Sequence, residues 1–185
     1  MTFTIQDLFK HPWRQNNMFC KSTYISVLIE SRKLTGRNIK TGNKLQKSHG
    51  SWLGSLGYMV IIDLLADVIN ISFRSAQGEY TNNSIKFMRQ FFNLSYDEAC
   101  SLYALRCAFA HDFGLTNSHT RSELNKKFSV TQGTNFLIHH DTTRGIYVVD
   151  LEKFGDLIED FHSKVKSSQI TITGNITDDL FIIHR

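Results

Sequence analysis

Arg106 and His111 are two side chains of this sequence that could do chemistry together. They lie in the otherwise apolar stretch YALRCAFAHDFGL, residues 103–115. An arginine guanidinium presents a planar fork of N–H donors that fits phosphate oxygens. A histidine with an ordinary pKa near ~6.5 exchanges protons at neutral pH. If both face one point, the pair could hold a phosphate group and move a proton beside it.

The spacing of the two residues sets a condition on this chemistry. Five residues along a regular α-helix correspond to about 7.5 Å of rise and roughly 140° of rotation, so the side chains are not direct neighbours. The long side chain of Arg106 can bend toward the helix end. A loosening of the helix at Ala110 and His111 would turn the imidazole inward, and the two groups would then face a common point.

The helix that must position this pair begins at a capping box. Ser95 and Glu98 have the spacing at which the serine accepts from an early backbone amide and the glutamate reaches back to the serine N–H. The helix is predicted to run to about Ala110 or His111 and to stop before Gly114, which tolerates a left-handed conformation.

Apolar residues at helical spacing predict four more helices. Their ranges are 16–33, 51–71, 81–93 and about 150–165. At the start of the second of these, Gly50, Gly54 and Gly57 indicate close packing against another helix or a frayed first turn.

Asp63 and Asp67 lie four residues apart on the helix predicted over 51–71. Residues at this spacing share one side of a helix, and we expect this pair to face solvent. A metal site built on the two carboxylates is the alternative.

The last third of the chain has a different character. Three short stretches rich in β-branched and aromatic residues, KFSVTQG, NFLIHH and GIYVVDL, predict a small antiparallel sheet or hairpin. The apolar run from Leu180 to Ile183 must pair with this sheet or with another subunit, because unpaired edges invite association. We therefore predict a mainly α fold, with a helical bundle over residues 1–125 and a small C-terminal α+β extension, made of antiparallel strands plus one helix, over residues 126–185.

Residues 31–50 form the most basic segment and contain no acidic residue. Glycines and polar residues predict a loop, and a loop of this length is either functional or partly disordered. Its cations could neutralise RNA phosphates without reading sequence, while a solvated connector is the alternative. The candidate binding residues are Arg37, Lys40, Lys44 and Lys47.

Composition favours a globular protein of a reducing compartment. Hydrophobic residues make up 41% of the 185, enough for a real core. Cys20, Cys100 and Cys107 lack disulfide or metal spacing and are expected to be buried thiols. We expect a cytoplasmic location, since the sequence shows neither a secretory leader nor a membrane-spanning stretch.

No cofactor and no metal site are predicted. His139 and His140 are adjacent, so in a strand they point to opposite faces, and we expect both at a surface. No serine or cysteine triad and no nucleotide-binding glycine motif supports another chemistry.

The arrangement around Arg106 and His111 resembles the Arg-x(4–6)-His signature of HEPN domains, which lies near the end of a long helix. The resemblance covers roughly residues 15–125. It implies a bundle of four or five helices that is usually dimeric. Many members are metal-independent endoribonucleases of toxin–antitoxin, defence and RNA-processing systems. Others are non-catalytic modules that bind nucleotides or protein partners.

The resemblance also implies a role for each residue. His111 would act as general base or acid on the ribose 2′-hydroxyl or the leaving 5′-oxygen, and Arg106 would hold the scissile phosphate. The implied substrate is single-stranded RNA, the products carry a 2′,3′-cyclic phosphate and a 5′-hydroxyl, and the implied assembly is a homodimer.

Two other interpretations stay open. A HEPN-like bundle without catalysis could bind nucleic acid or a protein, and Leu105 and Cys107 stand where active members often carry polar residues. The other is a helical structural protein unrelated to the family. Under either interpretation, Arg106 can pair with Asp97 or Asp112 across a helix interface, and His111 can cap carbonyls at the helix end.

Overall fold

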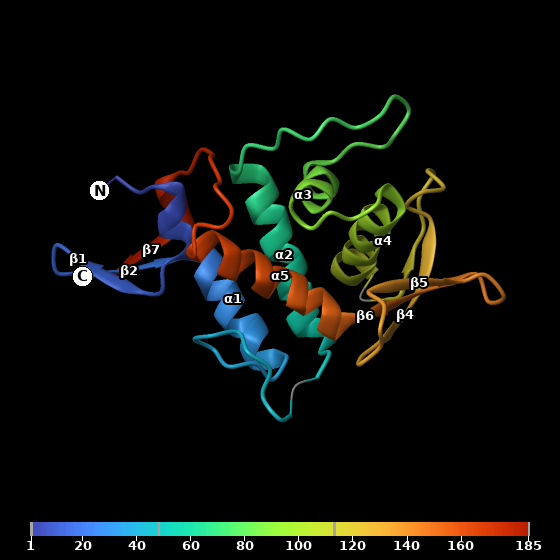
Figure 1. Cartoon of the computed structure of the whole chain (residues 1–185), viewed down its shortest axis with the longest axis horizontal. Coiled ribbons are helices and arrows are strands. Elements are labelled where there is room, and N and C mark those ends of the chain that lie inside the picture. Colours follow the sequence, from blue (N-terminus) through green and yellow to red (C-terminus); the bar gives the residue numbers. More distant parts are fainter. Residues whose placement is uncertain (1, 48, 113, 185) are drawn as a thin grey trace.

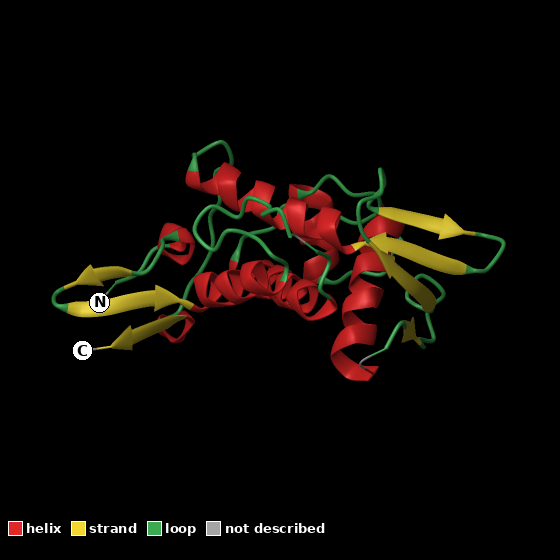
Figure 2. Cartoon of the chain, turned by 90° about the horizontal axis from the view of Figure 1, so that it is seen from below, coloured by secondary structure: helices red, strands yellow, loops and turns green. Residues whose placement is uncertain are grey.

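Helices fill the middle of the molecule, and a small sheet lies at each end of it (Figure 1 and Figure 2). This computed structural model describes residues 2–47, 49–112 and 114–184, and the side chains of residues 111 and 112 lie outside the description. The chain is 43% helical and 18% strand. The fold is therefore α+β, and the prediction of a mainly α fold with a small α+β extension is wrong.

The described residues form five α-helices, two sheets and three short helical turns. The helices are α1 (Thr23–Leu34), α2 (Trp52–Val68), α3 (Asn83–Phe91), α4 (Tyr96–Cys107) and α5 (Leu151–Lys166). The turns are η1 (Ile5–Phe9), η2 (Ala108–Asp112) and η3 (Asp178–Leu180). One sheet has the strand order β1 (Trp13–Gln15), β2 (Met18–Ser22), β7 (Phe181–His184), and the other β3 (Thr116–Asn117), β4 (Lys126–Thr131), β6 (Ile146–Asp150), β5 (Ile138–Asp141). None of these helices has the length and apolar character needed to cross a bilayer.

Polar residues cap four of the predicted helices and fix where they begin. Side-chain oxygens of Ser51, Asn82, Ser95 and Asp150 accept backbone N–H groups at the starts of α2, α3, α4 and α5. The capping box predicted for Ser95 and Glu98 is formed. These four helices are confirmed.

The prediction of a helix over 16–33 is wrong for its first half, which is strand. Asn16 and Asn17 have φ values of 50° and 62°, and asparagine tolerates this left-handed conformation. They make the two-residue turn that joins β1 to β2. The helix begins only after Ser22, whose hydroxyl accepts from the Ile25 amide at 3.0 Å.

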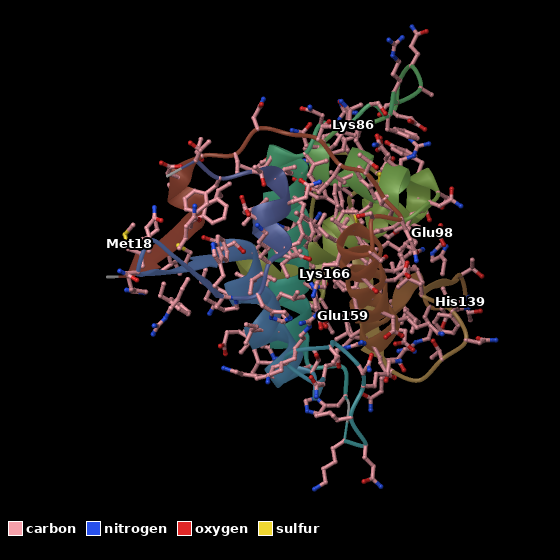
Figure 3. All side chains as sticks on the ribbon, turned by 60° about the vertical axis from the view of Figure 1, so that its left-hand side comes forward. Met18, Lys86, Glu98, His139, Glu159 and Lys166 are labelled. Atoms are coloured by element: carbon pink, nitrogen blue, oxygen red, sulfur yellow. The ribbon has the colours of Figure 1, made fainter. Side chains whose placement is uncertain are left out.

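The strand near the C-terminus completes the sheet that the N-terminal hairpin begins. β7 pairs antiparallel with β2, with Cys20 opposite Ile183, and the two chain ends lie near one another in Figure 1. Figure 3 shows Met18 at the outer part of this sheet. The apolar terminal run therefore pairs within the chain, although with a different sheet from the one predicted.

The second sheet contains the predicted hairpin but is not antiparallel throughout. β5 and β6 form the hairpin, and their turn passes through Gly145 at a φ of 62°. β4 pairs with β6 in parallel, with Phe128 opposite Tyr147. The parallel pair arises because the chain leaves β4, forms β5 at the outer edge, and returns as β6 between them.

Helices α1 and α2 pack closely because small residues lie between them. A Cβ at Gly54 would lie 2.6 Å from Thr35 Cγ2 and 3.2 Å from the Ser31 carbonyl oxygen, and one at Gly57 would meet the Ser31 side chain. Contacts this short leave room for glycine alone. The interpretation of Gly54 and Gly57 as close-packing residues is confirmed.

One hydrophobic core runs through the helices and reaches both sheets. Phe161 of α5 is 2% exposed and packs against Phe9, Phe87 and Phe91, with ring centroids 5.3–6.1 Å apart. The helix predicted within the extension over 126–185 thus contributes directly to the core of the helical part.

Arg32 of α1 and Glu159 of α5 form a buried ion pair. Their side chains are 1% and 11% exposed, and Arg32 Nη2 lies 2.6 Å from Glu159 Oε2. The Tyr58 hydroxyl of α2 donates to the other carboxylate oxygen at 2.9 Å, and Arg32 Nη1 donates to the Ile39 carbonyl at 2.9 Å. Figure 3 shows Glu159 near the middle of the molecule. The pair therefore joins three helices and the segment that follows α1.

Replacing Glu159 by glutamine is expected to lower the free energy of unfolding by about 3 kcal/mol, because the buried Arg32 charge loses its counter-charge. Asp160→Asn is the matched control, since it makes the same change at the next residue in an exposed pair with Lys164 at 2.7 Å. The control should cost at most about 0.5 kcal/mol. Urea denaturation measures both, and equal losses would contradict the importance of the buried pair.

His162 of α5 is buried as a neutral imidazole. It is 4% exposed, and its Nδ1 lies 2.9 Å from the Tyr24 hydroxyl. Burial, assisted by the positive charges of Arg32 and Lys166, lowers the pKa of His162 to about 3.

The stability of the fold is expected to fall on acidification because of His162. The unfolded chain protonates this residue near ~6.5, whereas the folded chain holds its pKa at about 3. Its contribution is therefore present above the unfolded pKa and is lost as pH falls toward the folded one. We expect a loss of about 2 kcal/mol between pH 7 and pH 5, measured by urea denaturation. His162→Gln should remove this loss and His139→Gln, on an exposed strand, should retain it; an unchanged loss in His162→Gln would refute the assignment.

Candidate functional site

Arg106 lies in the last turn of α4 and is paired with Asp63 of α2. Arg106 Nε donates to Asp63 Oδ2 at 2.7 Å, and the two side chains are 28% and 25% exposed. The other oxygen of Asp63 accepts from the Ser84 hydroxyl of α3 at 2.7 Å. One carboxylate therefore joins α2, α3 and α4 beside Arg106.

These contacts correct two expectations from the sequence. Asp63 does not face solvent as Asp67 does, because it binds Ser84 of α3 and Arg106 of α4, and only Asp67 is exposed. The described partner of Arg106 is Asp63, whereas Asp97 binds Lys126 at 2.7 Å. The side chain of Asp112, the other expected partner, lies outside the described residues. The charged group on α2 is thus part of the site.

A concave pocket of about 250 Å³ opens beside this pair. It is lined by Asp63, Asp67, Asn82, Asn83, Ser84, Tyr103 and Arg106, which come from α2, α4 and the start of α3. A smaller adjoining hollow shares Asp63, Ser84, Tyr103 and Arg106 with this pocket. Its other lining is apolar: Met59, Ile62, Met88, Leu102 and Phe154. Drug-sized sites occupy about 300–1,000 Å³, so this pocket suits a smaller group such as a sugar phosphate.

The orientation of Arg106 leaves donors for a ligand. Its contact with Asp63 uses Nε. Among the side chains that the structure describes, no oxygen accepts from either Nη atom of Arg106. Asp63 therefore fixes the inner side of the guanidinium while the outer edge can bind an anion in the pocket.

The charges of the site are nearly balanced. Burial opposes the charge of Arg106, but Asp63 and Cys107 together outweigh it and raise the pKa of the guanidinium. Burial raises the pKa of the Cys107 thiol and of the Tyr103 hydroxyl, so both stay protonated at neutral pH. The lining of one guanidinium and the carboxylates of Asp63 and Asp67 carries a formal charge of −1.

The helix that carries the candidate pair changes its winding before His111. Its α-helical part ends at Cys107, and a π-helical turn follows over Ala108–Asp112. Such turns are wider than α-helical ones and are frequent at functional sites. The loosening at Ala110 that the chemistry requires is therefore present in the backbone. The side chain of His111 lies outside the described residues, so its approach to Arg106 stays a prediction.

The basic segment 31–50 is held against α5. Arg37 has a side chain 3% exposed and binds Asp156 at 2.7 Å. Lys44 bridges Glu152 at 3.1 Å and Asp156 at 2.8 Å. Two of the four candidate binding cations, Arg37 and Lys44, are thus already paired with acidic residues of α5. Asp156 lies 119 residues after Arg37 in the sequence.

The other two candidate cations, Lys40 and Lys47, are exposed. Neither lines the pocket at Arg106. Contact between these lysines and RNA phosphates stays a prediction.

The described residues do not gather metal ligands. Asp63 is engaged by Arg106 and Ser84, and no group of three or more His, Cys, Asp or Glu side chains within the described ranges could hold a metal ion. His139 and His140 are exposed on β5, and Figure 3 shows His139 at the far side of the molecule from Met18. Cys20 and Cys100 are buried and Cys107 is half-buried, without a disulfide in this part of the chain.

Sequence reasoning missed the groups that surround Arg106. The roles of Ser84, Asn82 and Tyr103 leave no local signal, because they depend on how α3 crosses α2 and α4. Asp63 did leave one, since it interrupts an apolar run on α2 just as Arg106 interrupts one on α4. Opposite charges on two apolar helices can be matched as partners, because neither is tolerated unpaired inside a core.

Comparisons of the chain with protein-family models, with curated proteins and with solved structures find no match. The likeness to HEPN domains thus rests on the helix that carries Arg106 and His111.

A double-mutant cycle of Asp63→Asn and Arg106→Gln is expected to give a coupling energy of about 1–2 kcal/mol, because the pair is charged, hydrogen-bonded and partly buried. The matched cycle at Glu30 and Lys33, an exposed pair at 2.7 Å, should give about 0.3 kcal/mol. Urea denaturation of the single and double variants measures both. A coupling at Asp63 no larger than at Glu30 would show that Asp63 does not hold Arg106.

Proposed function

We propose that this protein is a HEPN-like, metal-independent endoribonuclease that cleaves single-stranded RNA, as in toxin or defence systems. One observation carries the proposal. Arg106 lines a concave pocket, held there by Asp63, and a π-helical turn that includes His111 follows it directly. Such a change of winding is what an arginine and a histidine five residues apart need in order to face one phosphate.

Cleavage by this pair uses the 2′-hydroxyl of the substrate as nucleophile. The 2′-oxygen bonds to the adjacent phosphorus while the bond from phosphorus to the 5′-oxygen breaks. His111 takes the proton of the 2′-hydroxyl, and a solvent water donates a proton to the leaving 5′-oxygen; the hydroxide that remains then takes the proton from His111. Arg106 binds the non-bridging oxygens, on which negative charge develops. The products carry a 2′,3′-cyclic phosphate and a 5′-hydroxyl.

Asp63 acts as a positioning residue in this scheme. It holds Arg106 through Nε and is itself held by the Ser84 hydroxyl. A guanidinium that is ordered before the substrate arrives loses less conformational entropy when it binds.

The alternative is a HEPN-like module that binds nucleic acid or a protein without catalysis. The formal charge of −1 at the pocket, where Asp67 is exposed, favours the protein-binding form of this alternative, since such a site does not attract a polyanion. An RNA cleavage assay distinguishes the nuclease from the non-catalytic binding module.

The proposal includes a homodimer in the cytoplasm. Apolar side chains that are 39–48% exposed lie along α1, α2 and β7, and surfaces of this kind favour association. They are Leu34, Trp52, Leu53, Val60, Ile182 and Ile183. A two-fold assembly would bring two Arg106 pockets together, as the resemblance implies. Lys40 and Lys47 are the cations of segment 31–50 left to contact RNA.

Purified protein is expected to cleave single-stranded RNA in EDTA, and His111→Ala should lower the rate by about 10²–10⁴-fold because it removes the proton-transfer group. Arg106→Lys should also lower the rate, since it loses the fork that binds two oxygens. His139→Ala, an exposed histidine on β5, is the matched control and should cleave at the wild-type rate. Gel analysis gives the rate, and mass spectrometry identifies the cyclic phosphate.

Equal cleavage by wild type and His111→Ala would exclude His111 from catalysis. RNA binding without cleavage by the wild type would favour the binding module. Thermal denaturation of each variant establishes that it is folded.

A further inference from the structure

A group of aromatic and cationic side chains continues the wall of the Arg106 pocket. Tyr103 lines the pocket, and the ring of Tyr80 packs on it with centroids 6.4 Å apart. The Arg121 guanidinium lies 5.3 Å from the centroid of the Tyr80 ring, and the His119 ring lies 6.4 Å from it. The cleavage chemistry uses none of Tyr80, His119 and Arg121, which we call the Tyr80 patch.

The Tyr80 ring is held in place without a ligand. Its backbone amide donates to the Tyr96 hydroxyl at 2.7 Å. The preceding residue, Glu79, binds Arg89 at 2.6 Å, and the Arg89 guanidinium lies 4.4 Å from the centroid of the Phe73 ring. The connection between α2 and α3, which runs out past α3 in Figure 1, is therefore anchored where it meets the pocket.

Arg121 is the movable part of the patch. Its side chain is 53% exposed, and its nearest acidic partner, Glu123, is 3.9 Å away, which is too long for a hydrogen bond. Stacking of a nucleobase on a tyrosine ring is stronger than an exposed contact between a cation and a ring. A base can therefore replace Arg121 over Tyr80, and the released guanidinium can bind a phosphate.

We propose that the Tyr80 patch is a base-stacking subsite for single-stranded RNA. Tyr80 stacks the base of a nucleotide adjacent to the phosphate held at Arg106, and Arg121 binds the next phosphate. This inference rests on the proposed function, because it takes the Arg106 pocket as the phosphate site. It assigns a substrate with unpaired bases, since bases in a duplex are covered by their neighbours. Stacking accepts every base, so sequence preference should be weak.

Tyr147 of β6 offers a matched control. Its ring also has a cation over it, Lys126 at 3.8 Å, and a histidine ring beside it, His140 at 4.3 Å. It does not line the Arg106 pocket. Replacing Tyr80 or Tyr147 by leucine therefore removes the same group, but only Tyr80→Leu removes it from the proposed subsite.

The experiment compares binding of two labelled strands by fluorescence anisotropy. One is a short 2′-O-methyl oligouridine, which lacks the 2′-hydroxyl nucleophile, and the other is the same backbone with abasic residues. Wild type and Tyr147→Leu should prefer the base-bearing strand. Tyr80→Leu should bind that strand about 5- to 100-fold more weakly and should lose the preference, whereas Tyr80→Phe should retain it.

The inference is overturned if Tyr80→Leu keeps the preference, if wild type shows none, or if neither strand binds. RNA cleavage by the wild type is scored separately. Cleavage together with a preference unaffected by Tyr80→Leu rejects the subsite alone. A preference that depends on Tyr80, without cleavage, supports the subsite and rejects the nuclease.

A second variant covers the case in which Tyr80→Leu does not fold. Arg121→Gln changes an exposed side chain and should reduce the slope of log affinity against log salt by about 0.7, one phosphate contact, for both strands. An unchanged slope would overturn the phosphate contact assigned to Arg121.

Discussion

The buried pair of Arg32 and Glu159 is the constraint on which much of this structure depends. A charge inside a core is tolerated only with its counter-charge and with its remaining donors satisfied. Here that requirement fixes α5 against α1, brings in the Tyr58 hydroxyl from α2, and draws the segment after α1 close enough for the Ile39 carbonyl to accept. The orientation of the helices follows from one carboxylate as well as from apolar burial.

The same helix explains why the most basic segment is not a free cationic surface. Arg37 and Lys44 reach across to Asp156, one turn before Glu159 on α5. Acidic residues of α5 thus neutralise Arg37 and Lys44, although the sequence alone shows these cations in a segment without acidic residues. Net charge along a segment describes a surface only when the fold does not bring an opposite charge to it.

Features encoded locally could be predicted, and features that need distant partners could not. The starts of α2 to α5 follow from capping residues such as Ser51 and Ser95, whose contacts lie within one helical turn. The turn at Asn16 and Asn17 is also local, but apolar residues on both sides of it imitate helical spacing. The parallel pairing of β4 with β6 leaves no local signal, because it depends on where the chain crosses the sheet.

The candidate site divides in the same way. The position of Arg106 at the end of a capped helix could be predicted, and the change of winding over Ala108–Asp112 agrees with the loosening that a shared phosphate site requires. Its partner Asp63 was not predicted, although its place in an apolar run was a signal, because a carboxylate spaced four residues from Asp67 also fits a solvated helix face. The element that covers a given helix face is decided by tertiary packing, which local sequence does not show. Here that packing places Asp63 against Arg106, so that an acid expected at the surface holds the guanidinium.

The pairing of β2 with β7 has a consequence for how the chain folds during its synthesis. β2 pairs with β1 on one edge and with β7 on the other. Because Cys20 pairs with Ile183, β7 is synthesised more than 150 residues after β2. A contact that spans the chain is slow to form, because the intervening loop must close first. The N-terminal hairpin therefore waits with an open edge during synthesis, a period in which a chaperone or a neighbouring nascent chain can reach it.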